Sequence, residues 1–209
     1  MKKALVFTFL LINTLSTYAQ KEPDFLINHN KVWVDSVFAT LTLEDKIGQL
    51  LMPRGNTSGE PHDVTKLKNW VKNYHIGGIV MFAAPPTVQA RIVNELQALS
   101  KVPLLIGMDL EWGLAMRLDS TVRFPYQMTL GAMRGNEKLL YEMGVEVGKQ
   151  CRRMGVHINY APVVDVNINP NNPVINFRSF GENPKDVAQK ALAYMQGMNS
   201  EKLLTSAKH

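Results

Sequence analysis

Ile76–Phe82 reads IGGIVMF and Pro103–Asp109 reads PLLIGMD, and both runs are almost entirely apolar. Short apolar runs without polar alternation are typical of strands buried on both faces, as in a parallel sheet. Between them, Val88, Ile92 and Leu96 keep the spacing of one helix face. A buried strand, a helix and a second buried strand form one crossover unit, so the two strands are expected to run parallel.

The same alternation continues on both sides of this unit. Helical spacing predicts apolar helix faces within 34–41, 64–74, 140–154 and 187–198, strands within 156–166 and 203–207, and loops at 55–61 and 167–173. Asn136 and Asn183 are expected to be N-caps. Thr42–Asp45 resembles a capping box that starts a further short helix. The run Ile47–Met52 either completes that helix or forms a first strand, since periodicity does not separate the two.

Two architectures alternate strands with helices, the β/α barrel and the open doubly wound sheet. Nucleotide-binding doubly wound sheets carry a glycine-rich phosphate loop, and this sequence contains neither a GxGxxG nor a P-loop pattern. We therefore expect an α/β fold of the (β/α)8 TIM-barrel type. A full barrel takes about 250 residues. The 209 residues here are expected to form an incomplete barrel, about the first five β/α units.

The composition, 45% hydrophobic and 20% charged, is typical of a globular protein and excludes collagen-like and disordered classes. The net charge is +5, but the longest basic run is Arg152–Arg153, and Lys2 and Lys3 supply part of the excess. A solvated mixed surface explains this charge better than a phosphate-binding groove, so no nucleic-acid partner is expected. The single cysteine, Cys151, excludes an internal disulfide and is expected to fill a helix face.

The first residues have the layout of a secretory signal peptide. Met1–Lys3 is positive, Ala4–Leu15 is uncharged and mostly apolar, and Ala19 follows at the place of a cleavage site. The apolar core is too short to span a bilayer, and a buried N-terminal helix is disfavoured because the stretch has no polar face. We expect an exported protein, periplasmic or secreted, with no membrane association after signal removal. The expected divisions are a signal peptide at 1–19, a linker at 20–32 and a barrel domain at 33–209.

Charged residues follow the ends of the predicted strands. They are Asp109, Glu111, Arg117, Asp165, Arg178, Lys208 and His209. Barrel enzymes build their sites at the carboxyl ends of the strands, so these residues are expected to share one rim. A sugar hydroxyl both donates and accepts hydrogen bonds, so a rim of carboxylates and cations suits a neutral sugar.

Each of these residues also has a structural interpretation. In this interpretation Asp109 serves only as a cap of the next helix, and the position of Asp165 among valines favours a structural role. Arg178 would then neutralise one of these two carboxylates, Glu111 would be an exposed loop charge, and the last two residues a frayed end. No histidine pair has metal-ligand spacing, so no metal and no cofactor is expected. Two rival interpretations are a non-catalytic sugar-binding protein and a nucleotide-binding α/β protein. The absence of a glycine-rich fingerprint counts against the second.

The joint order of several short motifs is more specific than any one of them. The motifs are LTLEDKIGQL at 41–50, IGGI at 76–79, IGMDLEWG at 106–113, FP at 124–125, NYAPVVDV at 159–166, RSFGE at 178–182 and AKH at 207–209. From about residue 33 to His209, this series resembles the N-terminal domain of glycoside hydrolase family 3. It is most similar to the β-N-acetylglucosaminidase-like branch and to exported enzymes of the Bacteroidetes type.

The resemblance implies a β/α barrel and retaining hydrolysis of terminal, non-reducing β-N-acetylglucosaminides, with a carbohydrate as substrate. The implied sugar-binding residues are Asp109, Arg117, Arg178, Lys208 and His209. A β-glucosidase of the same family is the alternative activity. The branch pattern resembles Asp-x-Glu-Gly-Gly, and Trp112 replaces one of its glycines. That tryptophan either stacks on a sugar face or plugs the rim.

Retaining hydrolysis requires a carboxylate nucleophile and an acid/base about 5–5.5 Å apart. In the family, the nucleophile is an Asp on a later strand, and the acid/base of this branch is a His-Asp pair after the Lys-His pair. Both positions would follow His209, so we expect no catalytic residue in this sequence and no turnover by the chain alone. An incomplete barrel also leaves two open sheet edges, which predicts poor solubility.

Overall fold

The computed structural model describes residues 30–56 and 61–209. The predicted signal peptide at 1–19 and nearly all of the predicted linker at 20–32 lie outside the described residues. The chain divides into two compact units between Leu41 and Thr42. Of the first unit, the structure describes helix α2 (Lys31–Ala39), which starts at the N-cap Asn30 and buries none of its residues.

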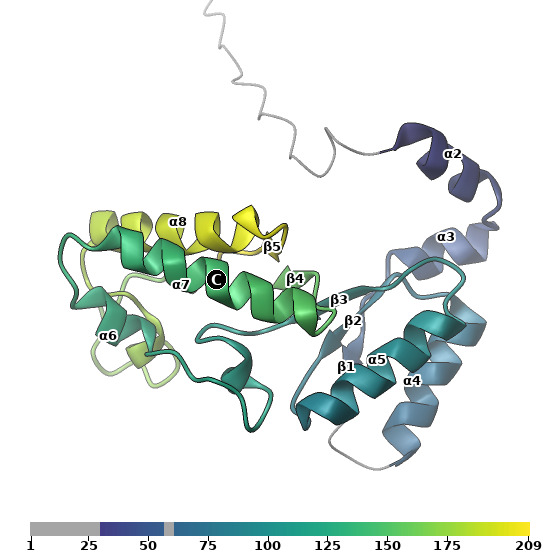
Figure 1. Cartoon of the computed structure of the whole chain (residues 1–209), viewed down its shortest axis with the longest axis horizontal. Coiled ribbons are helices and arrows are strands. Elements are labelled where there is room, and N and C mark those ends of the chain that lie inside the picture. Colours follow the sequence, from purple (N-terminus) through teal and green to yellow (C-terminus); the bar gives the residue numbers. More distant parts are fainter. Residues whose placement is uncertain (1–29, 57–60) are drawn as a thin grey trace, which may run out of the picture. The chain divides into compact units, whose positions relative to one another are not determined.

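Helices and short strands alternate through the second unit (Figure 1). The strands are β1 (Arg54–Gly55), β2 (Gly78–Met81), β3 (Leu105–Met108), β4 (Ile158–Asn159) and β5 (Leu204–Thr205). The helices are α3 (Leu43–Gln49), α4 (Pro61–Tyr74), α5 (Pro86–Leu99), α6 (Gln127–Gly131), α7 (Glu137–Arg153) and α8 (Pro184–Ser200), with 3-10 turns η1 (Leu114–Met116) and η2 (Asn176–Arg178). No helix in the described part of the chain is both long and apolar enough to cross a membrane.

The five strands form one parallel sheet in the order β1-β2-β3-β4-β5. Ile79 pairs with Ile106 between β2 and β3, and Met108 pairs with Asn159 between β3 and β4. In a doubly wound sheet the strand order reverses, whereas an unbroken chain order with right-handed crossovers keeps successive helices on one face. The predicted α/β fold of barrel type is therefore confirmed, and the described residues supply five parallel strands of it.

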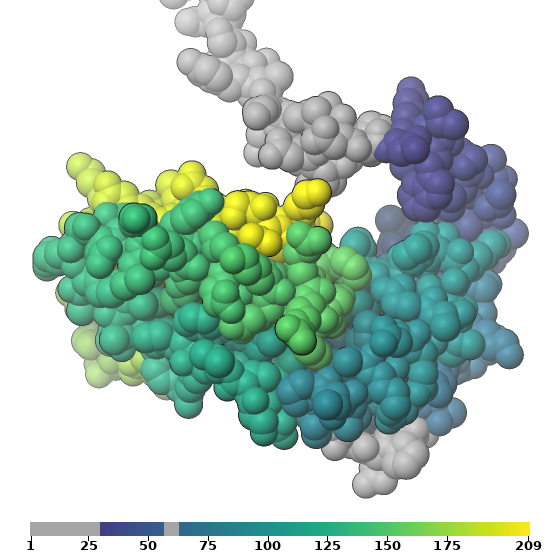
Figure 2. All heavy atoms as spheres, viewed as in Figure 1, coloured from purple at the N-terminus to yellow at the C-terminus, as the bar shows by residue number. Residues whose placement is uncertain are grey.

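The core lies between the sheet and the helices that follow each strand. Ile79, Met81, Ile106 and Met108 of the two central strands are fully buried. The helices add the fully buried side chains Val71, Leu96, Val147 and Tyr194. Figure 1 shows α7 running along α8 and α5 running along α4, and Figure 2 shows the atoms of α5 and α7 on the face turned to the viewer. The apolar runs that predicted buried strands thus mark the centre of the sheet.

The first strand lies where the sequence predicted a loop. The ambiguous run Ile47–Met52 completes α3, which ends at Gln49, and then leaves the helix. Strand β1 follows at Arg54–Gly55, and its two residues pair with Val80 and Met81 of β2. The prediction of a loop from residue 55 is therefore wrong at its start. Strand β1 has only two residues and no apolar run, so the sequence pattern does not predict it. It is a strand only because it pairs with β2.

The predicted helix starts differ in their chemistry. Thr42 and Asp45 form the expected capping box of α3. The Asn183 side chain accepts hydrogen bonds from two backbone N–H groups at the start of α8. Asn136 is the N-cap residue of α7, as predicted, but its side chain makes no capping hydrogen bond. The backbone of Asn136, at φ −132° and ψ 44°, is not the extended conformation of an N-cap.

Helices α7 and α8 pack closely where two glycines meet. A Cβ added to Gly144 would lie 3.0 Å from the Cα of Gly197, and one added to Gly197 would lie 2.9 Å from the Cα of Gly144. Cys151 on α7 is buried, as expected for a helix-face filler, and burial raises the pKa of its thiol to about 12. This helix pair supports the loops that follow β3 and β4.

Candidate functional site

The loop after β3 carries two carboxylates, Asp109 and Glu111, to the carboxyl edge of the sheet. Asn159 at the end of β4 fixes the backbone between them. Its side chain accepts a hydrogen bond from the Leu110 N–H (3.0 Å) and donates one to the Leu110 carbonyl (3.2 Å). Gly113 then turns the chain with a φ of 81°, a conformation that suits glycine. The local backbone therefore holds both carboxylates in place.

Asp109 binds two cationic side chains. Its Oδ1 accepts a hydrogen bond from Lys208 Nζ at 2.7 Å, and its Oδ2 accepts one from Arg117 Nη2 at 2.8 Å. The Arg117 guanidinium also lies 4.7 Å from the centre of the Phe82 ring, which follows β2. Segments that follow β2, β3 and β5 therefore meet at Asp109. The alternative interpretation of Asp109 as a helix cap is wrong, because its oxygens bind these side chains.

Glu111 is fully buried and joins two cations. Its Oε1 accepts hydrogen bonds from Arg178 Nη2 (2.7 Å) and lies 2.9 Å from Lys208 Nζ, while its Oε2 accepts one from Arg178 Nε (3.0 Å). The Glu111 backbone carbonyl accepts a hydrogen bond from Gln127 Nε2 at 2.6 Å. Interpreting Glu111 as an exposed loop charge is therefore wrong. The two parallel hydrogen bonds set the plane of the Arg178 guanidinium.

Lys208 and His209 are anchored beside the end of β4. Lys208 exchanges two backbone hydrogen bonds, of 3.1 and 2.7 Å, with the segment that follows β4. His209 Nδ1 lies 2.7 Å from Asp165 Oδ2, and its Nε2 lies 3.3 Å from Arg178 Nη2. The interpretation of these two residues as a frayed end is therefore wrong, and Asp165 holds the imidazole ring.

One continuous network joins all five predicted site residues. It runs Arg117–Asp109–Lys208–Glu111–Arg178–His209–Asp165. The structure thus brings the five side chains together, and their role in binding a sugar stays a prediction. The sequence analysis placed Glu111 and Asp165 on the rim but not among the binding residues. The Asp-x-Glu motif is a usable signal, since it places a second carboxylate in the loop directly after a buried strand.

The network holds its two central carboxylates in the ionised form. Burial alone would raise the pKa of Asp109, but the hydrogen bonds and charges of Lys208 and Arg117 outweigh it and lower that pKa. Burial is likewise outweighed at Glu111 by Arg178 and Lys208, which lower its pKa. The hydrogen bonds with Glu111 raise the pKa of Arg178. At neutral pH the site therefore presents fixed negative and positive charges.

Several of these charged groups remain accessible to a ligand. The side chains of Asp109, Arg117, Arg178 and Lys208 are 16 to 24% exposed, and His209 is 46% exposed. The buried Nε of Arg117 has no hydrogen-bond partner. Acceptors beside donors suit vicinal hydroxyl groups, each of which both gives and receives a hydrogen bond. No group of three His, Cys, Asp or Glu that could hold a metal occurs among residues 30–56 and 61–209.

Known proteins resemble this chain over most of its length. Residues 42–209 match the model of the glycosyl hydrolase family 3 N terminal domain. The beta-hexosaminidase A of Pseudoalteromonas piscicida is 35% identical over 156 residues, which cover 69% of this chain and 26% of that protein. A beta-N-acetylglucosaminidase/beta-glucosidase of Cellulomonas fimi is 29% identical over 177 residues, which cover 85% of this chain and 30% of that protein.

A solved structure shares the same arrangement of elements. The glycoside hydrolase family 3 beta-N-acetylglucosaminidase from Paenibacillus sp. str. FPU-7 superposes with a TM-score of 0.71 at 34% identity, over 81% of this chain and 33% of that chain. The chain thus spans about a third or less of the length of these relatives. The family model, the fold and the ordered motifs agree, and this chain belongs to glycoside hydrolase family 3.

Proposed function

We propose that this chain supplies the sugar-binding part of an enzyme that hydrolyses terminal, non-reducing β-N-acetylglucosaminides with retention of configuration. The observation that carries the proposal is that Asp109 and Glu111 share the ammonium group of Lys208, at 2.7 and 2.9 Å. The names of two relatives, a beta-hexosaminidase and a beta-N-acetylglucosaminidase, support the same class of substrate.

The hydrogen-bonding capacity left in the network suits a pyranose. A carboxylate has about four acceptor positions, and the hydrogen bonds from Arg117 and Lys208 use two of those of Asp109. The remaining positions accept hydrogen bonds from two sugar hydroxyls. Arg117 and Lys208 stand on either side of the same carboxylate and donate to the hydroxyl oxygens. A carboxylate with a cation on either side orients the hydroxyl groups of a sugar. Because these opposite charges already balance each other, the ligand needs no charge of its own.

These carboxylates are suited to binding and not to the chemical steps. Retaining hydrolysis needs one carboxylate that attacks and one group that gives a proton to the leaving oxygen. The pKa of Asp109 and of Glu111 is lowered, so neither is a proton donor at neutral pH. Both are also tied to cations, which weakens them as nucleophiles. We therefore expect the 209-residue chain to bind sugar without cleaving an aryl N-acetyl-β-glucosaminide.

Binding measurements on the 209-residue chain test this proposal. We expect N-acetylglucosamine to bind the wild-type chain in a calorimetric or NMR titration, and Asp109→Asn to weaken binding about tenfold or more, because a charged hydrogen-bond acceptor is lost. Asp119→Asn is the matched control, since Asp119 is an exposed acid of the same loop. Equal affinities of the wild-type and Asp109→Asn chains would overturn the proposal, as would turnover by the wild-type chain.

A β-glucosidase is the second candidate function. The name of the Cellulomonas fimi relative includes both activities, which supports keeping it. The same titration separates the two, because Arg117 is the residue that the resemblance links to the acetamido sugar. Glucose binding as tightly as N-acetylglucosamine favours the glucosidase.

We also propose that the protein is exported and loses residues 1–19. The support is the positive, apolar and small-residue order of that segment. Expression of the chain in a bacterium with two membranes, followed by mass determination of the periplasmic fraction, tests it. A mature chain that starts at Gln20 is expected. Recovery of the uncleaved chain from the cytoplasm alone contradicts the proposal.

A further inference from the structure

Three aromatic side chains form a cluster beside the charged network. This aromatic cluster consists of Trp112, Tyr126 and Phe177. The Trp112 and Tyr126 rings meet edge to face, with centres 4.8 Å apart and planes at 86°. The Tyr126 and Phe177 ring centres are 4.5 Å apart, and those of Trp112 and Phe177 are 6.3 Å apart. Rings at these separations attract each other and hold a fixed arrangement.

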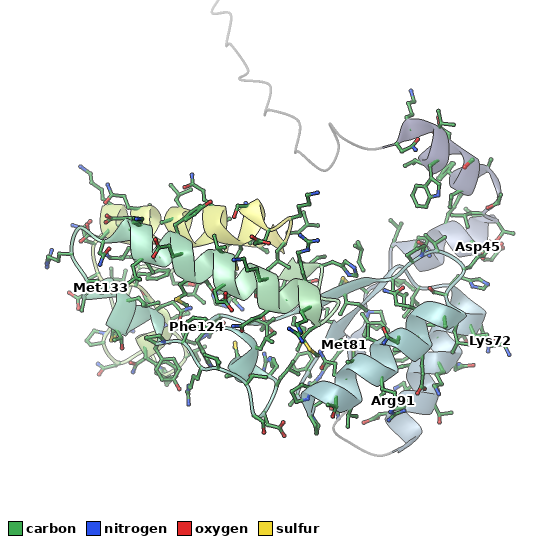
Figure 3. All side chains as sticks on the ribbon, viewed as in Figure 1. Asp45, Lys72, Met81, Arg91, Phe124 and Met133 are labelled. Carbon is green, nitrogen blue, oxygen red and sulfur yellow. The ribbon has the colours of Figure 1, made fainter. Side chains whose placement is uncertain are left out.

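The aromatic cluster joins the same two loops as the charged network. Trp112 directly follows Glu111, and Phe177 directly precedes Arg178, so each ring is the chain neighbour of one member of the Glu111–Arg178 ion pair. Each of these two rings is therefore attached one residue away from a member of that ion pair. Figure 3 labels Phe124, which lies on the loop after β3, and its backbone N–H donates a hydrogen bond to the Trp112 carbonyl at 3.2 Å.

The aromatic cluster is open to solvent, unlike the core. Phe177 is 41% exposed, and Trp112 and Tyr126 are only partly buried. Two neighbouring apolar side chains of the same loops, Val122 and Val174, are 63% and 62% exposed. Closely packed rings that are left accessible next to hydrogen-bonding groups are a feature of ligand sites more than of cores.

An arginine with free donors lies over the same rings. The Arg123 guanidinium is 4.6 Å from the centre of the Tyr126 ring and 5.8 Å from that of Trp112. Stacking uses the flat face of the guanidinium and leaves its N–H donors at the edge. Within the described part of the chain, no hydrogen bond or ion pair engages them. The cluster therefore combines a ring surface with unused donors.

We propose that the aromatic cluster and Arg123 form a second sugar subsite, which binds the pyranose linked to the terminal sugar. This inference rests on the proposed function and extends it from a single sugar to a β-linked oligosaccharide. A β-linked pyranose has flat faces of C–H groups, whose hydrogens are attracted to the negative face of an aromatic ring. Hydroxyls at its edge accept hydrogen bonds from the donors of Arg123. Of the two interpretations of Trp112, stacking on a sugar face and plugging the rim, this proposal takes the first.

The charge balance favours a neutral sugar ring over an unrelated apolar ligand. The surface combines aromatic rings, the cation of Arg123 and the carboxylates of the adjacent network. A purely apolar ligand would bury the Arg123 guanidinium without a hydrogen-bond partner, and burying an unpaired charge is costly. A pyranose satisfies both the rings and the donors. The attachment of the rings beside Glu111 and Arg178 in the chain places this surface next to the proposed site of the terminal sugar.

A comparison of two ligands tests the inference on the 209-residue chain. The probes are N-acetylglucosamine and its β-1,4-linked dimer, and the measured quantity is the ratio of their affinities by calorimetry. We expect the dimer to bind more tightly to the wild-type chain. In Phe177→Ala the ratio should fall about fivefold, because ring stacking of this kind is lost. Tyr74→Ala is the matched control, since Tyr74 is 59% exposed near the opposite edge of the sheet, and it should leave the ratio unchanged.

The outcomes separate this inference from the proposed function. An unchanged ratio in Phe177→Ala overturns the subsite, even when Asp109→Asn abolishes the binding of the single sugar. Binding of neither probe by the wild-type chain, or binding insensitive to Asp109→Asn, overturns the proposed function itself. Phe177→Leu keeps the side-chain volume without a ring, so a fivefold fall there as well assigns the effect to stacking and not to misfolding.

Discussion

Single charged residues have different roles at the two edges of the sheet. At the amino edge, Asp45 of α3 (labelled in Figure 3) accepts a hydrogen bond from Lys101 Nζ at 2.6 Å. Its other oxygen lies 3.5 Å from His75 Nε2. It also caps its own helix. Asp45 therefore ties α3 to the turns before β2 and β3, which is a structural task. At the carboxyl edge, the network around Asp109 keeps donors and acceptors for a ligand.

The Asp45 contacts predict a specific acid sensitivity. The hydrogen bond from Lys101, with that from the Thr42 backbone, lowers the pKa of Asp45 from 3.8 to about 2. Its contribution to the free energy of unfolding is thus present above about pH 4 and is lost as the pH falls towards about 2. In urea denaturation at a series of pH values, Asp45→Asn should lose less stability over that range than the wild-type chain. The variant Asp119→Asn, at an exposed position, should lose as much stability over that range as the wild-type chain. Equal losses in the wild type and both variants would contradict the role given to Asp45.

Because Glu111 is buried, we predict that replacing its carboxylate by an amide lowers the stability of the chain. Glu111→Gln keeps the shape of the side chain but leaves Arg178 and Lys208 beside a neutral group. Breaking a buried ion pair costs about 3 kcal/mol. Guanidinium denaturation should show a loss of that size, while Glu182→Gln, at an exposed position of the loop before α8, should change stability little. A loss below about 1 kcal/mol in Glu111→Gln would mean that the pair adds little to folding.

Helix starts offer a test at the scale of the elements, because two asparagines occupy the same position with different contacts. Asn183 caps α8 with its side chain, whereas Asn136 makes no such bond at α7. Asn183→Ala should therefore lower the free energy of unfolding by about 1 kcal/mol, and Asn136→Ala should change it much less. Urea denaturation of the two variants measures the difference. Equal losses would show that the side-chain bond is not the source of the stabilisation.

The sequence predicted the elements whose residues carry their own signal. Strands β2 and β3 lie at the centre of the sheet, so their residues are apolar throughout, and the runs at 76–82 and 103–109 identified them. Strand β1 consists of Arg54 and Gly55 and depends on its neighbour, so no pattern in the sequence marked it. The five site residues were found from strand ends and ordered motifs. The ion pair between Glu111 and Arg178 could not be predicted from the sequence, because the two residues come from different loops that only the folded chain brings together.

At the scale of the whole sheet, each edge strand pairs on one side only among the described residues. Strand β1 pairs with β2 alone, and β5 pairs with β4 alone. Beside β1 there is a cavity of about 490 Å³, which is lined by Leu51, Met52, Pro53, Asn69, Trp70, Tyr74 and Ile76. Leu50 and Leu51 next to it are 85% and 50% exposed. Unpaired strand edges with nearby apolar surface are sites of association between chains.

We therefore predict that the 209-residue chain associates with itself as its concentration rises. Sedimentation velocity over a concentration series should show a growing fraction of larger species. The double variant Leu50→Lys with Leu51→Lys should reduce that fraction, because charges beside an open edge oppose pairing. Leu139→Lys on α7 is the matched control, since Leu139 is 46% exposed but lies away from β1, and it should have little effect. A single monomeric species at every concentration would show that neither the edges nor this apolar surface drives association.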